Sequence, residues 1–254
     1  MKQCVTGLLV AALMWSGGVI AQPLEAPGLK ASVAKRAYQA LTCAKRYGAD
    51  PKMVIVVDMS MPSYQRRLWA FEWRDRPELI LNDYVAHGRG SDPDGNGVPQ
   101  AFGNELGSGM TALGAYRVAE QYEGKYGLSR RLDGLMRGWN EAARERAVVL
   151  HPSNYVRPGA VGRSLGCPAV QYDTIELLEK NDLTGALLWI DGPDQRLNDA
   201  VATCNGKGWF TPPSVHGEPV PVLPMSRPEE KNPIWAFTRM CVECPFGSNQ
   251  AFME

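Results

Sequence analysis

The chain has 254 residues, which is enough for one domain with a full hydrophobic core and some length left over for further segments. Its 27 basic and 27 acidic residues balance, so the sequence creates no electrostatic field that would attract a polyanion. We therefore expect no nucleic-acid partner.

The N-terminus has the pattern of an export signal. An apolar run from Val5 to Trp15 follows the single Lys2, and small residues end at Ala21. The run is shorter than the roughly 20 residues that a membrane-spanning helix needs. We therefore expect residues 1–21 to be a signal peptide that is cleaved near Ala21. The mature protein should be periplasmic or secreted and have no stable membrane anchor.

The next apolar pattern has the period of a helix. The spacing predicts an amphipathic helix from Leu29 to Tyr47, with Gly48 as its C-terminal stop. We expect this helix to form an N-terminal helical segment, residues 22–52, that packs on the body of the protein. A role at a membrane surface or with a partner is the alternative.

From Met53 onward the pattern becomes that of strands. Val54 to Val57 predicts a buried strand, Trp69 to Trp73 alternates as a second strand, and turn residues between them predict a hairpin. Leu79 to Val85 predicts a further strand, whereas Leu132 to Arg146 has a helical pattern. These elements together favour the α+β class, with a predominantly β core.

The loop from Ser91 to Gly97 imitates the first half of a calcium-binding loop. Asp92, Asp94 and Asn96 stand at ligand positions, but the twelfth position is a glycine where a bidentate glutamate is needed. We expect a surface turn here, with a weak metal site as the alternative, and we predict no metal and no cofactor for the protein.

His87 precedes this loop, between a predicted strand and a glycine. The sequence allows two interpretations of it. It could be a buried, hydrogen-bonded structural residue, or it could line a substrate pocket together with Ser91. His216 lies in a proline-rich tail, and the sequence identifies no partner for it.

The stretch from Ala147 to Val170 carries the chemistry. A short apolar run ends at His151, and a glycine-rich turn then leads to Cys167. A cysteine between a glycine and a proline cannot lie in the middle of a helix, so the turn should display its sulfur. A thiol near an imidazole supplies a nucleophile and a base for attack on a carbonyl.

The number of cysteines supports a reactive thiol. Loss of residues 1–21 would leave five of the six cysteines, so at least one would stay unpaired within the chain. An unpaired cysteine in an oxidising compartment is usually either a defect or a nucleophile. The other four can pair in three ways, among which the sequence does not choose. We expect at least one disulfide that ties the tail to the body. The candidates are Cys43, Cys204, Cys241 and Cys244. A redox pair or half of a zinc site at Cys241-x-x-Cys244 is the alternative.

The last third of the chain is rich in proline. The prolines from Pro193 onward exclude a long helix or a central strand, but several tryptophans and phenylalanines argue against a disordered tail. We expect residues 192–254 to form an irregular extension across the catalytic domain, residues 53–191. Whether this extension gates the cleft is open.

Several sequence motifs resemble those of the murein L,D-transpeptidase (YkuD-like) family. The catalytic signature is similar to H-P-S-N-Y-V at 151–156 and G-R-S-L-G-C-P-A-V at 162–170. The similarity extends to V-A-H-G-R-G-S at 85–91, G-S-G-M-T-A-L-G-A-Y at 107–116 and G-K-Y-G-L-S-R-R-L-D-G-L at 124–135. It implies a β-sandwich-like catalytic fold. Many members carry an arginine two places after the cysteine, where this chain has Ala169, as in a divergent branch.

The resemblance, together with the chemistry of the turn, assigns roles to individual residues. Cys167 would be the nucleophile and His151 the base, and Ser164 or a carbonyl of the same turn would hold the other nitrogen of the histidine. The backbone N–H groups of Gly166 and Cys167 would form the oxyanion hole. Carboxylates of the substrate call for arginine. The candidates for substrate binding are Arg163, Arg146, His87, Ser91 and Tyr155.

In the family that the chain resembles, the acyl donor is a peptidoglycan stem tetrapeptide. The cysteine attacks its meso-diaminopimelate carbonyl with release of D-alanine, and an amine then resolves the thioester. The resemblance therefore implies an exported L,D-transpeptidase acting on peptidoglycan stem peptides. Two alternatives stay open. One is a cysteine hydrolase with the same dyad, either an L,D-carboxypeptidase or an amidase, and the other is a non-catalytic wall-binding protein.

Overall fold

Strand β1 (Met53–Asp58) lies near the middle of the sheet and all six of its residues are buried. Its run of valine and isoleucine favours extended backbone, and burial on both faces explains why it lacks polar alternation. β1 pairs in parallel with β10 (Leu187–Asp191) and antiparallel with β2 (Leu68–Trp73). The predicted hairpin of the first two strands is thus confirmed.

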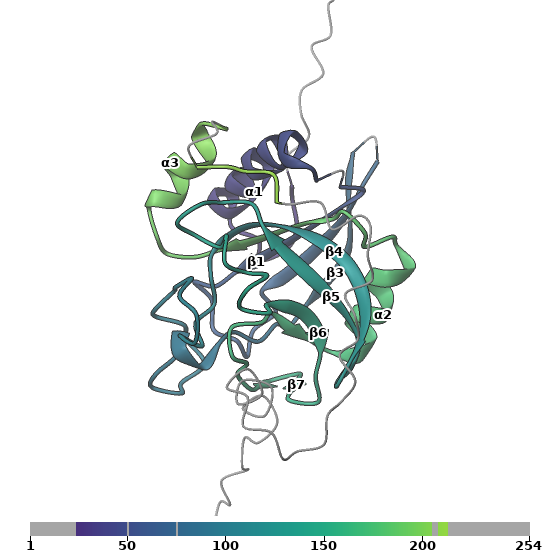
Figure 1. The fold of residues 1–254 in the computed structure, drawn as a ribbon. Coiled ribbons are helices and arrows are strands. Elements are labelled where there is room, and N and C mark those ends of the chain that lie inside the picture. Colours follow the sequence, from purple (N-terminus) through teal and green to yellow (C-terminus); the bar gives the residue numbers. More distant parts are fainter. Residues whose placement is uncertain (1–23, 50, 75, 205–207, 213–254) are drawn as a thin grey trace, which may run out of the picture.

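The structure, a computed structural model, describes residues 24–49, 51–74, 76–204 and 208–212 (Figure 1). The expected signal peptide, residues 1–21, lies outside this part of the chain, as do Cys241, Cys244 and His216. Within the described residues, no helix is long and apolar enough to cross a membrane.

Eight strands form one curled, mixed sheet in the order β3-β2-β1-β10-β4-β5-β6-β9. The strands not yet named are β3 (Pro77–Asp83), β4 (Gly114–Gly124), β5 (Gly127–Gly134), β6 (Val149–Pro152) and β9 (Ala169–Val170). A separate two-stranded ribbon consists of β7 (Val156–Arg157) and β8 (Ala160–Val161). The predominantly β, α+β class is therefore confirmed.

The expected N-terminal helix is present as α1 (Ala31–Ala44), which the 3₁₀ turn η1 (Lys45–Tyr47) continues to Gly48. Gly48 has a φ of 91°, which ends the helix in the left-handed conformation that glycine adopts readily. The other helices are α2 (Tyr172–Lys180) and α3 (Arg196–Ala202), with a second 3₁₀ turn, η2 (Arg89–Ser91). Residues of α1, α3 and the sheet share one hydrophobic core. The domain boundaries given above stay a prediction.

Two ion pairs attach α1 to the ends of the central strands. Asp58 and Asp191 are register partners in β1 and β10, and both side chains are buried. Lys30 Nζ lies 3.1 Å from Asp58 Oδ2, and Arg36 donates to the two carboxylate oxygens of Asp191 at 2.7 and 2.8 Å. Each strand-end carboxylate thus has a cationic partner from the helix or its N-terminal edge.

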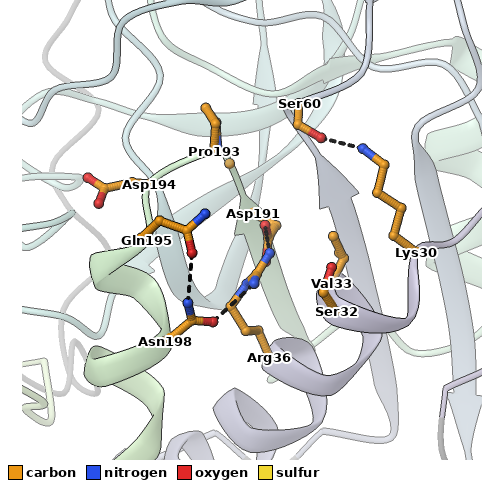
Figure 2. Close-up of a pocket in the computed structure, with 11 residues that line it drawn as sticks. Lys30, Ser32, Val33, Arg36, Ser60, Asp191, Pro193, Asp194, Gln195 and Asn198 are labelled. Atoms are coloured by element: carbon orange, nitrogen blue, oxygen red, sulfur yellow. Dashed lines mark hydrogen bonds and ion pairs between the residues drawn. The ribbon is translucent and has the colours of Figure 1, made fainter.

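A polar pocket of about 400 Å³ opens beside these ion pairs, between α1 and α3 (Figure 2). Its lining includes Lys30, Ser32, Arg36, Asp191, Gln195 and Asn198. The charges of Lys30 and Arg36 are paired with Asp58 and Asp191, and Arg36 also donates to Asn198 Oδ1 at 3.1 Å. The contacts in this pocket therefore join two helices to the sheet.

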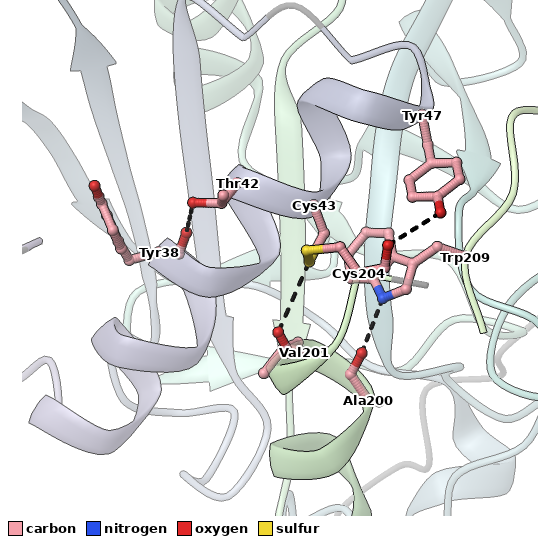
Figure 3. Close-up of a disulfide and its surroundings, with 8 residues drawn as sticks. All are labelled: Tyr38, Thr42, Cys43, Tyr47, Ala200, Val201, Cys204 and Trp209. Atoms are coloured by element: carbon pink, nitrogen blue, oxygen red, sulfur yellow. Dashed lines mark hydrogen bonds between the residues drawn. A yellow bond between two sulfur atoms is a disulfide. The ribbon is translucent and has the colours of Figure 1, made fainter. Parts of the chain in front are cut away.

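The first part of the tail is fastened to the body by a disulfide. Cys43 of α1 is bonded to Cys204, which follows α3 (Figure 3). Trp209 is buried, and its Nε1 donates to Ala200 O at 2.8 Å. Phe210 N also donates to Leu135 O at 3.1 Å. The expected disulfide between tail and body is confirmed with this pairing.

The helix predicted for Leu132 to Arg146 is wrong. Residues 132–134 end strand β5, and a series of turns follows. The side chain of Asn140 folds back into the turn: its Oδ1 accepts from Met136 N at 3.0 Å, and its Nδ2 donates to Ala115 O at 2.9 Å. Gly138 has a φ of 76°, which interrupts a helix. These side-chain hydrogen bonds, one local and one to a distant strand, outweigh the apolar spacing that suggested a helix.

We predict that Gly134→Ala destabilises the protein more than Gly138→Ala does. A Cβ at Gly134 would lie 1.9 Å from Asn140 O, so backbone must move, whereas a Cβ at Gly138 meets nothing within 4 Å and only its positive φ opposes alanine. We expect a loss of about 3 kcal/mol in the free energy of unfolding for the first variant and about 1 kcal/mol for the second. Urea unfolding measures both. Equal losses would contradict the tight contact between Gly134 and Asn140.

Candidate active site

Cys167 lies in the glycine-rich turn between β8 and β9. It is a half-buried thiol rather than half of a disulfide in the part of the chain that the structure describes. Gly166 before it has a φ of 119°, and a Cβ there would lie 2.7 Å from Met110 O. Only glycine fits such a position without moving the backbone. Cys167 Sγ lies 3.9 Å from the carbonyl oxygen of Ala147, a residue that itself has a φ of 52°.

His151 is brought to the same place by strand pairing. β6 and β9 are parallel, with His151 opposite Ala169 in the register. His151 N donates to Pro168 O at 3.4 Å, one residue beyond Cys167. The fifteen residues between the histidine and the cysteine therefore form a loop that returns to the neighbouring strand, so the predicted dyad residues lie on adjacent segments.

The tautomer of His151 follows from its hydrogen bond. Nδ1 lies 2.9 Å from Pro152 O, and a carbonyl can only accept, so Nδ1 carries the proton. Nε2 then bears the lone pair that a general base needs. Burial lowers the pKa of His151, and the hydrogen bond to the Pro152 carbonyl partly offsets this. The imidazole is thus held neutral and in the tautomer that can accept a proton at Nε2.

The prediction that Ser164 orients this imidazole is wrong. Ser164 Oγ donates to Cys167 O at 2.6 Å and accepts from Gly166 N at 3.0 Å. The orienting carbonyl belongs to Pro152, outside the turn. Ser164 therefore fixes the shape of the turn, because a side chain hydroxyl can bridge backbone groups two and three residues ahead.

The same contact corrects the predicted oxyanion hole. The Gly166 N–H donates to Ser164 Oγ, so it is engaged inside the turn and does not point to an incoming oxygen. The N–H of Cys167 stays a predicted oxyanion donor.

Two tyrosines surround the imidazole. The ring of Tyr126 stacks on His151 with centroids 5.4 Å apart, and Tyr155 meets it edge-on at 6.5 Å. Tyr155 was predicted as a substrate-binding residue and lies beside the base. Sequence reasoning missed Tyr126, although the residue lies inside the quoted motif at 124–135. The glycines on either side, Gly124 and Gly127, mark the turn that carries it to the histidine, and this signal could have singled it out.

The two candidate arginines differ in their contacts. Arg146 donates to Gly103 O at 3.0 Å and to Met110 O at 2.5 Å, so it holds the 103–110 loop beside the turn. Arg163 is exposed and donates through Nη1 to Asp92 O at 2.6 Å. Of the two, Arg163 has the exposed guanidinium that an arriving carboxylate requires.

His87 and Ser91 do not line a cleft, since both side chains are fully buried. The pocket-lining role predicted for them is therefore wrong, whereas the alternative of a buried, hydrogen-bonded His87 is confirmed. Ser91 Oγ accepts from Thr111 N at 2.9 Å.

The expected surface turn at 91–97 is buried at its start and exposed at its tip. Asp92 is buried, with carboxylate oxygens that accept from Asn96 N at 3.1 Å and Gly97 N at 2.9 Å. Asp94 and Asn96 are exposed. The described residues contain no group of three or more His, Cys, Asp or Glu side chains that could hold a metal ion.

Comparison with known proteins gives a family but no curated relative. A family model described as the L,D-transpeptidase catalytic domain (YkuD_2) matches residues 25–190. No curated protein matches the chain.

Several solved structures are similar at low identity. Bd1075 of Bdellovibrio bacteriovorus is 20% identical, over 56% of this chain and 48% of that one, with a TM-score of 0.36. The helical cell shape determining protein Pgp2 of Campylobacter jejuni is 13% identical, over 63% and 57%, with a TM-score of 0.39. An L,D-transpeptidase from Mycobacterium smegmatis is 12% identical, over 55% and 58%, with a TM-score of 0.33.

These alignments span only about half to three fifths of the solved structures, and their TM-scores are too low to support an argument about this chain. The family model is different, because its match runs from the segment before α1 to the end of β10, well over half of the sequence. On this match, the chain belongs to the L,D-transpeptidase catalytic-domain family.

Proposed function

We propose that the protein is an exported cysteine acyltransferase that acts on peptidoglycan stem peptides. The observation that carries the proposal is the pairing of β6 with β9. This pairing supports the proposal because it puts His151 opposite Ala169, two residues after Cys167, while His151 Nδ1–H donates to Pro152 O at 2.9 Å. A displayed thiol and a neutral imidazole with its lone pair on Nε2 are the two groups that thioester chemistry needs.

The reaction would proceed in two acyl transfers. His151 Nε2 takes the proton from Cys167 as Sγ bonds to the meso-diaminopimelate carbonyl carbon of the donor stem. The C–N bond to D-alanine then breaks, and the imidazolium returns its proton to the leaving amine. An acceptor amine attacks the resulting thioester, loses its proton to His151 and releases the thiolate, so that a new amide bond replaces the old one.

Arg163 is the proposed ligand for a carboxylate of the stem peptide. Its side chain is exposed, and it precedes Ser164 in the nucleophile turn. The guanidinium can bind a carboxylate with two parallel hydrogen bonds while Nη1 also contacts Asp92 O. A substrate held here would have one end fixed to the same turn that carries the thiol.

An extracytoplasmic location is part of the proposal. The pattern of residues 1–21 predicts export, and the Cys43–Cys204 disulfide is typical of proteins in oxidising compartments. The peptidoglycan substrate would be found in the same compartment.

We predict that the protein forms an acyl adduct at Cys167 when incubated with a purified diaminopimelate-containing tetrapeptide. Intact mass spectrometry should show a mass gain equal to the tetrapeptide minus D-alanine, and Cys167→Ala should show none. Adding a stem amine should discharge the adduct as a cross-linked product, whereas discharge by water alone would indicate the hydrolase. A wild-type protein without adduct, whose Cys167 reacts with iodoacetamide no faster than a free thiol, would contradict the catalytic proposal and favour a wall-binding protein.

We predict that the acylation rate of the wild-type protein falls with decreasing pH and that the midpoint of this fall lies below pH 6.5. The protonated imidazole cannot take the thiol proton, so the rate falls as His151 becomes protonated. Because burial lowers the pKa of His151 from 6.5, that fall is displaced to lower pH. The pH profile of kcat/KM measures the midpoint. Tyr126→Ala removes a ring that covers the imidazole and should move the midpoint up, towards 6.5. A wild-type midpoint at or above 6.5 would contradict a buried, neutral His151.

We predict that Arg163→Gln raises KM for the tetrapeptide about tenfold, because the substrate carboxylate loses a charge-assisted hydrogen bond. A substrate in which that carboxylate is amidated should bind wild type and variant alike. The matched control is Arg157→Gln, which changes another exposed arginine, on β7. Equal effects of the two substitutions on KM would argue against a specific contact with Arg163.

A further inference from the structure

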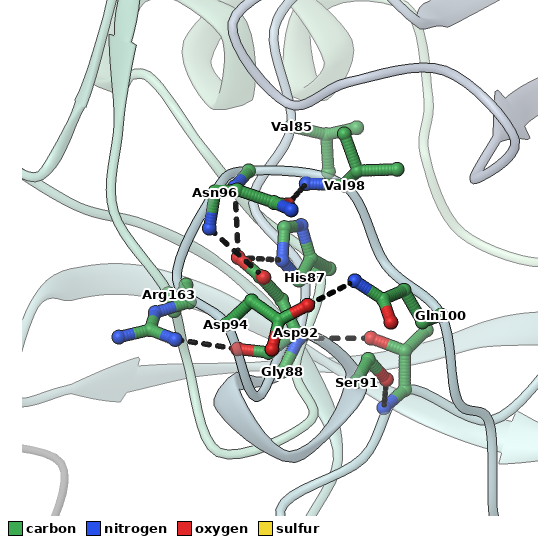
Figure 4. A network of polar contacts seen from close by, with 12 residues as sticks. Val85, His87, Gly88, Ser91, Asp92, Asp94, Asn96, Val98, Gln100 and Arg163 are labelled. Carbon is green, nitrogen blue, oxygen red and sulfur yellow. Dashed lines mark hydrogen bonds and ion pairs between the residues drawn. The ribbon is translucent and has the colours of Figure 1, made fainter.

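A chain of three polar side chains crosses the interior next to the nucleophile turn. Arg67 Nη2 lies 2.8 Å from His87 Nδ1, and His87 Nε2 lies 3.3 Å from Asp92 Oδ2. All three residues are fully buried. Figure 4 shows His87 and Asp92 of this hydrogen-bonded series, together with Arg163, which contacts the loop that carries Asp92.

The proton positions in this chain are fixed by its ends. An arginine can only donate, so Nδ1 of His87 accepts and Nε2 carries the hydrogen that is donated to Asp92. Burial, together with the charge of Arg67, lowers the pKa of His87 to about 4, so the imidazole is neutral. Its dipole thus lies between a cation and an anion, with the N–H towards the carboxylate. The other tautomer would place an Nδ1–H against the Arg67 donor and remove the hydrogen bond from His87 to Asp92.

The arginine at the other end is equally constrained. Arg67 donates from Nη1 to Met61 O at 2.7 Å and from Nη2 to Val85 O at 2.9 Å. A fully buried guanidinium that spans two carbonyls and an imidazole cannot move without leaving donors unsatisfied. Arg67 therefore fixes the position of the His87 ring relative to the start of β2.

The backbone of this segment holds the nucleophile turn. Ser164 N donates to His87 O, and Arg89 N donates to Ser164 O, each at 2.8 Å. Ala86 N donates to Ala169 O, also at 2.8 Å. Residues 86–89 thus run along both ends of the turn that contains Cys167. Arg163 is linked to the same network through Asp92 O.

We infer that His87 is a positioning residue for the nucleophile. Its imidazole, locked between Arg67 and Asp92, sets the place of its own carbonyl, and this carbonyl holds Ser164 and with it the turn that presents Cys167. The inference rests on the proposed acyl transfer for its consequence in catalysis, but the positioning itself is a property of the fold. His87 does not act as a second acid or base, since both ring nitrogens are engaged and the ring is fully buried.

Amide hydrogen exchange tests the positioning without any substrate. In His87→Leu, which has no ring nitrogens, the backbone amides of residues 162–168 should exchange roughly tenfold faster than in wild type, while those of β1 should keep their protection. His87→Gln offers an amide oxygen and an amide N–H in the same space and should restore most of the protection. Unchanged exchange at 162–168 in a folded His87→Leu would overturn the inference.

Kinetics test the consequence. The acylation rate, kcat, of Cys167 with the tetrapeptide should fall roughly tenfold to a hundredfold in His87→Leu, with a smaller change in KM, because a displaced nucleophile loses alignment more than binding. His87→Gln should recover most of the rate. The control is Val201→Ala in α3, which lowers the unfolding temperature far from the site and should leave kcat unchanged. If Val201→Ala and His87→Leu reduce kcat alike at equal loss of stability, the inference fails.

Two further results separate the possible failures. If His87→Leu does not fold, Asp92→Asn takes its place and should show faster exchange at 162–168 than wild type, whereas His87→Gln should stay close to wild type. Wild-type rates of exchange in Asp92→Asn would overturn the inference. If wild type forms no acyl adduct, the proposed function fails, but the exchange data still decide whether His87 positions the turn.

Discussion

The site depends on a close approach of backbones around Gly166. A Cβ on Gly88 would lie 2.8 Å from Gly166 Cα, and a Cβ on Gly166 would lie 2.7 Å from Met110 O. With no side chains between them, the segments are joined by peptide hydrogen bonds such as Ser164 N to His87 O. Such bonds have narrow preferred distances, so the turn has little freedom to shift. A nucleophile on a loop can in this way be held as firmly as one on a strand.

The two described histidines have opposite tautomers, and the difference follows from their neighbours. His151 faces a carbonyl at Nδ1 and must donate there, whereas His87 faces a guanidinium at Nδ1 and must accept. Burial lowers the pKa of both rings. In His151 the remaining nitrogen bears a lone pair, which suits a base. In His87 the remaining N–H is hydrogen-bonded to a buried carboxylate, which suits a structural residue with a fixed orientation.

Sequence patterns predicted what depends on local chemistry. The buried valine and isoleucine run of β1, the amphipathic period of α1 and the displayed cysteine of a glycine turn are all consequences of short segments. The missed features depend on contacts between distant segments. Asn140 bonds to Ala115 across 25 residues and turns a helical pattern into loops. Three further features could be identified only from the three-dimensional structure. They are the disulfide partner of Cys43, the hydrogen bonds of Ser164 within its own turn, and the carbonyl that orients His151.

Helix α1 is coupled to the catalytic sheet by charge, and this bears on where the catalytic unit begins. Asp58 and Asp191 end neighbouring strands, and burial raises the pKa of Asp191 even though Arg36 opposes the shift. Without α1, both carboxylates would lose their cationic partners, Lys30 and Arg36. The loss is greater for Arg36–Asp191, which is mostly buried, because removing one partner of a buried pair typically costs about 3 to 5 kcal/mol. Since β1 and β10 also lead to the rest of the sheet that carries His151, the helix contributes to the stability of the same body as the active site.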